Sequence, residues 1–260
     1  MCLTASRAPA AIGQCGCLDA YLICATPRTG SSLLCGLLAS TGVAGNPESY
    51  FRQQDELSWA ARWGISEPDG TFEYALYLQR ALAAGRSENG VFAARVMWGT
   101  LDEIVDKLAS VYPDLARQDL DLLNRAFGQP KFVYLRRRDV VAQAVSWLRA
   151  EQTQVWVARR DEPRGEPHFE FDRLREMRRI IDNDNAAWQT WFTAVGAEPH
   201  RVIYEDLDRD PVSVTRRVLD FLGLALPSGH TVQIRHRRLS DRLNAEWVER
   251  YIERDAGGST

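Results

Sequence analysis

The feature that most constrains the fold is a short apolar run that changes directly into a helical pattern. Residues Ala20–Ala25 are continuously apolar, which is typical of a central strand buried on both faces. The run stops at Thr26-Pro27, and after Gly30 the leucines of 33–38 follow a helical spacing. The segment is therefore predicted to form a strand, a tight loop and a helix, which is half of a βαβ unit.

The alternation of strands and helices continues along the chain. Further strands are predicted at 90–97, 132–135 and 201–204. Helices are predicted at 72–84, 101–108, 115–127, from Asp139 onward, 171–192, 210–222 and 244–253, and 42–51 is expected to be irregular or briefly extended. This alternation favours an α/β fold, a P-loop-like and mostly parallel sheet with helices on both faces. We expect one domain at 20–254, a flexible N-terminal extension at 1–19 and a frayed tail at 255–260.

The composition argues against several functional classes. A net charge of -3 at pH 7 gives no global reason to expect a nucleic-acid partner. No run approaches the roughly 18 apolar residues of a membrane span, so no transmembrane segment is expected. The 5 cysteines and 4 histidines have no paired metal-ligand spacing. We therefore expect no metal, reduced thiols and a cytoplasmic location.

The loop TPRTGSS after the first strand has the features of a phosphate cradle. A loop between a buried strand and a helix presents backbone N–H groups at the positive end of the helix dipole. Compared with the pattern G-x-x-x-x-G-K-[ST], Gly30 matches the second glycine, Ser31 replaces the lysine and Ser32 keeps the hydroxyl. The missing lysine argues against ordinary ATP or GTP hydrolysis. An ordinary strand-to-helix turn remains the alternative. The candidate anion ligands are Arg28, Thr29, Gly30, Ser31 and Ser32.

A second candidate anion site follows the predicted strand 132–135. Arg137 lies at the carboxyl end of that strand, and Ser146 lies over two helical turns later. Both could reach one phosphate, because ligands of open α/β sheets bind beyond the carboxyl ends of the strands. The alternative is a solvated arginine cluster with a small buried residue at Ser146. Two anion sites on one sheet are a more specific signal than one.

Several segments between Tyr21 and Tyr251 together carry a family resemblance. They are 26–34, 41–51, 96–98, 137–146, 152–153, 155–156, 204–207 and 246–251. In type and order they resemble sulfotransferases, specifically the bacterial family that includes trehalose 2-sulfotransferase and related carbohydrate or lipopolysaccharide sulfotransferases.

The resemblance implies direct, in-line transfer of a sulfuryl group from 3′-phosphoadenosine 5′-phosphosulfate (PAPS) to a hydroxyl of a carbohydrate or glycolipid. The product nucleotide would be adenosine 3′,5′-bisphosphate (PAP). It further implies that the first loop holds the 5′-phosphosulfate, with Arg28 stabilising charge on the leaving phosphate. Arg137 and Ser146 would hold the 3′-phosphate, with Arg238 as a further basic ligand. The resemblance also makes a homodimer plausible.

The acceptor side departs from the family pattern. Ser49 stands opposite the glutamate that serves the family as general base, and Glu48 is the neighbouring carboxylate. Serine alone is a poor base, so either Glu48 acts or the base lies elsewhere. Arg95, near the end of the predicted strand 90–97, could face the sulfuryl group or pair with a carboxylate. Tryptophan offers an apolar face to a sugar ring and polar groups orient it. The expected acceptor-binding residues are Glu48, Ser49, Tyr50, Trp98, Arg149, Gln152 and Trp156.

Two other functions remain open at this stage. One is a small-molecule kinase with a degenerate Walker loop, which the missing lysine disfavours. The other is a non-catalytic nucleotide-binding module, which the loss of the base at Ser49 suggests. ATP turnover would favour the first, and tight nucleotide binding without transfer would favour the second.

Overall fold

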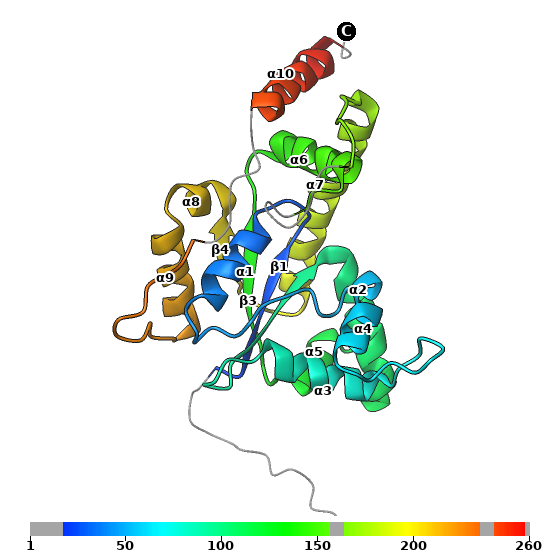
Figure 1. The fold of residues 1–260 in the computed structure, drawn as a ribbon, viewed down its shortest axis with the longest axis vertical. Coiled ribbons are helices and arrows are strands. Elements are labelled where there is room, and N and C mark those ends of the chain that lie inside the picture. Colours follow the sequence, from blue (N-terminus) through cyan, green and yellow to red (C-terminus); the bar gives the residue numbers. More distant parts are fainter. Residues whose placement is uncertain (1–17, 157–163, 235–241, 258–260) are drawn as a thin grey trace, which may run out of the picture.

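The computed structural model describes residues 18–156, 164–234 and 242–257 of the 260-residue chain. Within this part, strands pair in the order β2-β1-β3-β4, and every pair is parallel. The carboxyl ends of the strands therefore share one edge of the sheet (Figure 1), which confirms the predicted parallel α/β architecture. The strands are β1 (Ala20–Ala25), β2 (Phe92–Met97), β3 (Lys131–Arg136) and β4 (His200–Ile203).

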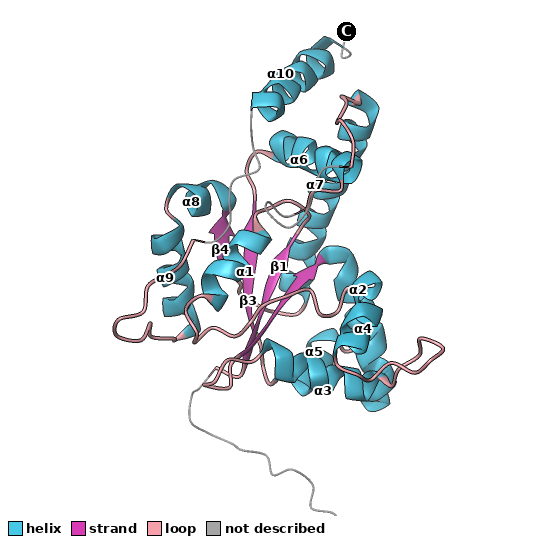
Figure 2. Ribbon diagram, in the orientation of Figure 1, coloured by secondary structure: helices cyan, strands magenta, loops and turns pink. Residues whose placement is uncertain are grey.

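Helices cover both faces of the sheet, as predicted (Figure 2). As in any β-strand, successive side chains of β1 point to opposite faces of the sheet. Tyr21 and Ile23 pack in a cluster with α1, α8 and α9, whereas Leu22 and Cys24 pack in a cluster with α2, α3, α4, α5 and α7. Their bounds are α1 (Ser31–Ala39), α2 (Gln53–Arg62), α3 (Tyr74–Gly85), α4 (Trp98–Val111), α5 (Asp119–Phe127), α7 (Phe171–Ala194), α8 (Tyr204–Arg209) and α9 (Pro211–Leu222).

A third apolar cluster extends the protein beyond the carboxyl edge of the sheet (Figure 1). It joins α6 (Val140–Thr153), the first half of α7 and α10 (Arg242–Gly257) through buried residues such as Leu148, Ile181 and Trp247. These helices place side chains above the strand ends, where a ligand of an open α/β sheet binds.

Most predicted elements are present, with three differences. Residues 115–127 do not form one helix: a 3₁₀ turn (Pro113–Leu115) precedes α5, and Arg117 between them has a left-handed φ of 70°. The helices α2 and α8 were not predicted, because both are short and polar. The third difference is that helix α10 continues through Gly257, into the segment expected to fray.

The predicted start of α6 is confirmed. The carboxylate of Asp139 caps this helix by accepting a hydrogen bond from the N–H of Ala142 at 2.8 Å, as its position suggested.

Candidate active site

The first loop connects β1 to α1 through two residues with left-handed backbone. Arg28 has φ 64° and Gly30 has φ 84°, and α1 begins at Ser31. A non-glycine residue in this conformation is uncommon and requires support from its surroundings. The first N–H groups of a helix have no partner within the helix. The loop therefore presents N–H donors and the positive end of the α1 dipole at the carboxyl end of β1.

Two buried side chains fix the conformation of this loop through hydrogen bonds. Thr29 donates its hydroxyl to the carbonyl of Thr26 at 3.0 Å and is fully buried. Gln143 of α6, also fully buried, donates its amide to the hydroxyl of Thr26 at 2.9 Å and to the carbonyl of Pro27 at 2.6 Å. The hydroxyl of Thr29 thus supports the loop, and Thr29 does not line the cavity beside it.

Replacing Gln143 by alanine is expected to destabilise the protein, because the hydroxyl and carbonyl that it serves lie in a buried site. Leaving such groups unpaired costs about 1–3 kcal/mol, which corresponds to a fall in Tm of roughly 2–12 °C for a chain of this size. Thermal unfolding measures the effect, and PAP binding should weaken with it. Gln189 is an exposed glutamine of α7 that bonds along its own helix, and its replacement by alanine should change stability by less than about 0.5 kcal/mol. Equal changes in both variants would refute the support assigned to Gln143.

Arg28 connects the loop to α6 and to the segment after it. Its Nε donates to Ser146 Oγ at 3.1 Å, and its Nη1 donates to the carbonyl of Trp156 at 2.6 Å. Burial and the neighbouring cation of Arg137 lower the pKa of Arg28 to about 10, while Tyr204 acts in the opposite direction. Two guanidinium groups therefore repel each other in a partly buried site, and a bound anion between them would be stabilised by both.

Arg137 follows β3 and faces the same space. Its guanidinium lies over the ring of Tyr204, 4.6 Å from the ring centroid. Its Nε is buried and has no hydrogen-bond partner among the described residues. The first loop, Arg137 and Ser146 are thus brought together, as the sequence predicted. Burying a charged donor without a partner is costly, so this atom indicates a place for an acceptor group of a ligand.

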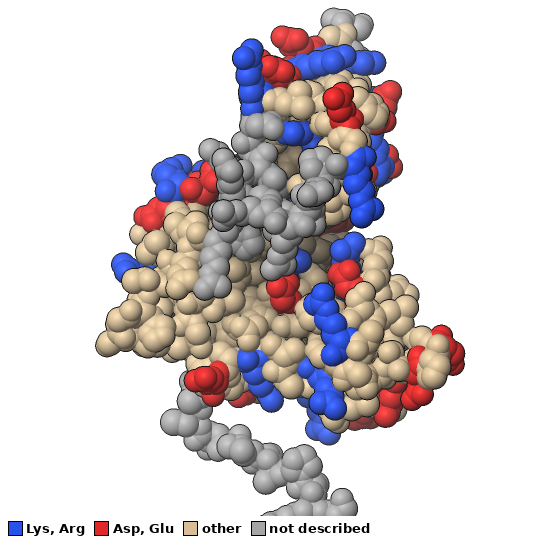
Figure 3. Space-filling view, viewed as in Figure 1, with Lys and Arg blue, Asp and Glu red and all other residues tan. Residues whose placement is uncertain are grey.

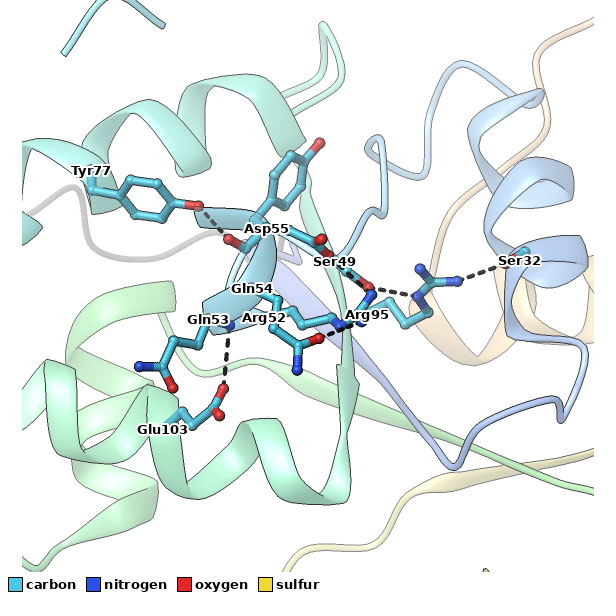
Figure 4. A network of polar contacts seen from close by, with 10 residues as sticks. Ser32, Ser49, Arg52, Gln53, Gln54, Asp55, Tyr77, Arg95 and Glu103 are labelled. Atoms are coloured by element: carbon cyan, nitrogen blue, oxygen red, sulfur yellow. Dashed lines mark hydrogen bonds and ion pairs between the residues drawn. The ribbon is translucent and has the colours of Figure 1, made fainter. Parts of the chain in front are cut away.

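Arg95 of β2 forms a network on the other side of the loop (Figure 4). Its Nη1 donates to Ser32 Oγ at 2.7 Å, and its Nε donates to Ser49 Oγ at 2.9 Å. The backbone N–H of Arg95 also donates to the carbonyl of Glu48 at 2.9 Å. Arg95 therefore pairs with hydroxyls, and the hydroxyl of Ser49 is occupied as an acceptor of this cation.

A single cavity of about 800 Å³ contains these groups. It is bounded by the first loop, the start of α2, the ends of β2 and β3, and parts of α4, α6, α7 and α8. This volume lies in the range of sites for small organic ligands. The predicted site residues that line it are Arg28, Gly30, Ser31, Ser32, Ser49, Arg137, Ser146 and Trp156.

Several residues expected at the acceptor site lie elsewhere. Tyr50 is 2% exposed and packs against Trp59, and its hydroxyl donates to the Asn46 carbonyl. Trp98 packs edge-to-face on Trp188 at 5.1 Å. Tyr50 belongs to the core cluster of α2, α3, α4, α5 and α7 and Trp98 packs against it, because aromatic rings gain from burial there.

Two polar residues of the predicted acceptor site instead form hydrogen bonds between α6 and neighbouring segments. Gln152 exchanges hydrogen bonds with the backbone of His168 and donates to Glu170 at 2.7 Å. Arg149 donates to the side chain of Asn244 in α10. Neither lines the cavity. Arg238 lies outside the described residues.

Glu48 does not line the cavity either. It is exposed, and its backbone forms a single parallel bridge with Ala94 at the edge of the sheet. The side chain of the adjacent residue, Ser49, points into the cavity, because neighbouring residues of an extended segment face opposite ways.

Asp184 of α7 lines the cavity and was not predicted. The signal for it lay in the helix spacing, since Asp184 is three residues after Ile181 and four before Trp188, both buried. Residues at such spacings share one helix face. A carboxylate on the buried face of a helix is a departure from the amphipathic pattern that marks a candidate site.

The described residues contain no group of three or more histidine, cysteine or acidic side chains placed to hold a metal ion. Over the same residues, no helix combines the length and the hydropathy of a membrane span. Cys24 and Cys35 are buried free thiols. On the face shown in Figure 3, basic and acidic side chains of the described residues are interspersed.

A strand-loop-helix anion cradle with two converging arginines on a parallel sheet is the class of site found in P-loop-like group transferases. The family model described as Stf0 sulphotransferase matches residues 20–254. The chain belongs to this family of sulfotransferases.

Two curated relatives have the same printed name. Trehalose 2-sulfotransferase of Mycobacterium tuberculosis is 29% identical, over 89% of this chain and 93% of the relative. Trehalose 2-sulfotransferase of Mycolicibacterium smegmatis is 31% identical, over 91% of this chain and 95% of the relative. Among solved structures, the sulfotransferase domain of the Synechococcus PCC 7002 olefin synthase is 18% identical with a TM-score of 0.44, over 91% and 95% of the two chains.

Proposed function

We propose that this sulfotransferase moves a sulfuryl group from PAPS to a hydroxyl of a carbohydrate. The observation that carries the proposal is the convergence of Arg28 and Arg137 at the N-terminus of α1, in one cavity. The two guanidiniums and the helix dipole suit a ligand with anionic groups at both ends of a nucleoside.

The donor end of the cavity supports PAPS in particular. The first loop and Arg28 would hold the 5′-phosphosulfate, and Arg137 with Ser146 would hold the 3′-phosphate. Arg28 reaches Ser146 directly, so the two groups of ligands are adjacent. During transfer, Arg28 and the N–H groups of the loop would stabilise the negative charge that develops on the phosphate of the leaving nucleotide.

The acceptor class rests on the relatives and on the other end of the cavity. Both curated relatives are named for sulfation of a sugar. In this chain Trp147 and Trp156 line the cavity together with Arg52, Gln53 and Gln54 at the start of α2. Flat apolar faces beside hydrogen-bonding groups suit a sugar ring.

The expected cytoplasmic location, homodimer and domain limits stay predictions, as does a glycolipid acceptor. The family membership favours sulfuryl transfer over the kinase alternative.

The test is transfer of ³⁵S-labelled sulfuryl groups from PAPS to a panel of sugars that includes trehalose and glycolipids. We expect a labelled sugar and stoichiometric PAP, with no requirement for added Mg²⁺. Turnover of ATP without sulfuryl transfer would contradict the proposal and favour a kinase. Tight PAP binding with no transfer would favour a non-catalytic module.

A further inference from the structure

The family resemblance places Ser49 at the position of the general base, and the hydroxyl of Ser49 accepts a hydrogen bond from Nε of Arg95. A neutral serine hydroxyl is a poor base, and the hydrogen bond that it accepts from a cation makes it still less able to take a proton from a sugar hydroxyl. Glu48 is exposed outside the cavity. If the proposed transfer occurs, another group must take the proton of the acceptor.

Among the described residues, four carboxylates line the cavity: Glu103, Glu151, Asp184 and Asp208. Glu103 accepts the N–H of Gln53 at the start of α2 (Figure 4). Glu151 is paired with Arg173 at 2.9 Å. Asp208 lies on α8, the helix of Tyr204, and so on the side of the 3′-phosphate ligands. Asp184 lines the same cavity and has no hydrogen bond or ion pair with the described residues.

A hydrogen bond between α7 and β1 fixes the position of Asp184 relative to the carboxyl ends of the strands. Trp188 donates its Nε1 to the carbonyl of Ala25, the last residue of β1, at 3.0 Å. Asp184 lies one turn earlier on the same face of α7. Because α7 runs toward the start of β4, its earlier turns lie beyond the carboxyl edge. Four residues of helix span about 6 Å, so Asp184 lies beyond the end of β1, at the level of the first loop.

A second anchor keeps this part of α7 rigid. Tyr134 of β3 donates its hydroxyl to Asn185 Oδ1 at 3.0 Å. Asn185 directly follows Asp184 and Trp188 lies one turn after it, and both are buried. Two fixed contacts within one turn of Asp184 hold the helix backbone that carries it, which favours the constant orientation that proton transfer requires.

We propose that Asp184 is the general base of this enzyme, in place of the residue that Ser49 replaces. In this step a carboxylate oxygen of Asp184 takes the acceptor's hydroxyl proton while the acceptor oxygen bonds to sulfur. The bond between sulfur and the 5′-phosphate oxygen breaks, and its electron pair leaves with PAP. Water takes the proton from Asp184 after release. The inference rests on the proposed sulfuryl transfer.

The surroundings of Asp184 support this role. Burial raises the pKa of Asp184 above its ordinary value, which makes its carboxylate a stronger base at working pH. A raised pKa in the folded state also means that the ionised form is penalised by folding. A neutral replacement should therefore leave the Tm unchanged or raise it, which separates a catalytic loss from a folding defect.

The experiment compares sulfuryl transfer and PAP affinity in wild type and Asp184→Asn. We expect kcat to fall at least about 100-fold, with PAP affinity within about twofold and Tm not lowered. Asp182→Asn, an exposed residue of the same helix, is the matched control and should retain wild-type kcat. Ser49→Ala and Glu48→Gln should each lose less than tenfold.

Chemical rescue gives an independent readout. Asp184→Ala removes the carboxylate and leaves space, so added formate should restore part of the transfer rate to this variant and not to wild type. Transfer by Asp184→Asn within threefold of wild type would overturn the inference while leaving the proposed function intact, as would a larger loss in Glu48→Gln. A wild type that transfers to no acceptor would refute the proposed function, and this role of Asp184 with it.

Discussion

Replacing Arg28 by alanine is expected to lower kcat/KM for sulfuryl transfer by roughly 10³–10⁴-fold. Part of this loss is ground-state binding, because a hydrogen bond to a charged group is worth about 1.5–3 kcal/mol, or about 10–150-fold in PAP affinity. The rest is lost stabilisation of charge on the leaving phosphate. Calorimetric titration with PAP and steady-state transfer kinetics separate the two parts.

Two further variants sharpen the test of Arg28. Arg28→Lys keeps the charge but cannot donate to both Ser146 and the carbonyl of Trp156, so it should recover only part of the activity. Arg62 is exposed and lies over the ring of Trp59, outside the cavity. Arg62→Ala should leave PAP affinity unchanged. If Arg28→Ala binds PAP as tightly as Arg62→Ala, the assignment of the first loop is wrong.

Replacing Gly30 by alanine is expected to abolish measurable PAP binding and to destabilise the protein. A Cβ at this position would lie 2.5 Å from Cδ2 and 2.9 Å from Cε2 of Tyr204, on a backbone with φ 84°. Overpacking and left-handed strain together cost about 2–4 kcal/mol. Because Arg137 lies over the same ring, displacing Tyr204 also displaces this proposed phosphate ligand. Thermal unfolding and PAP titration measure both effects.

Gly42 provides a matched control for the steric argument. It has φ 72°, and a Cβ there would have nothing within 4 Å. Gly42→Ala should therefore incur the backbone strain, about 1 kcal/mol, without any change in PAP affinity. Equal PAP binding by the two variants would show that contact between Gly30 and Tyr204 has no part in shaping the site.

The grouping of the first loop with Arg137 and Ser146 could be predicted from the sequence because its signals are local. A buried strand, a loop with glycine at a left-handed position and a helix follow one another within 20 residues. The carboxyl ends of parallel strands share one edge, so Arg137 was expected near the first loop once the sheet was parallel. Ser146 follows from the same rule, since α6 starts at that edge.

The acceptor side could not be predicted in the same way, because it depends on contacts between distant segments. Whether Trp98 faces a ligand or the core is decided by its packing on Trp188, 90 residues later. Gln152 does not face the cavity, because its side chain forms hydrogen bonds with the segment that precedes α7. Asp184 enters the cavity because Trp188 fixes the rotation of α7 against β1. Helical spacing alone predicts on which face of its helix a residue lies, but it does not predict which other parts of the protein that face contacts.

The most direct test of the account is calorimetric titration of PAP and of adenosine 5′-monophosphate, which lacks the 3′-phosphate. The proteins compared are wild type, Arg137→Ala and Arg138→Ala. Arg138 is exposed and paired with Asp206 at 3.0 Å, outside the cavity. We expect wild type and Arg138→Ala to prefer PAP by at least about tenfold and Arg137→Ala to lose most of that preference, since one charged contact is worth about 1.5–3 kcal/mol. A folded wild type that does not bind PAP, or binds both nucleotides equally, would contradict a PAPS site formed by the first loop and Arg137.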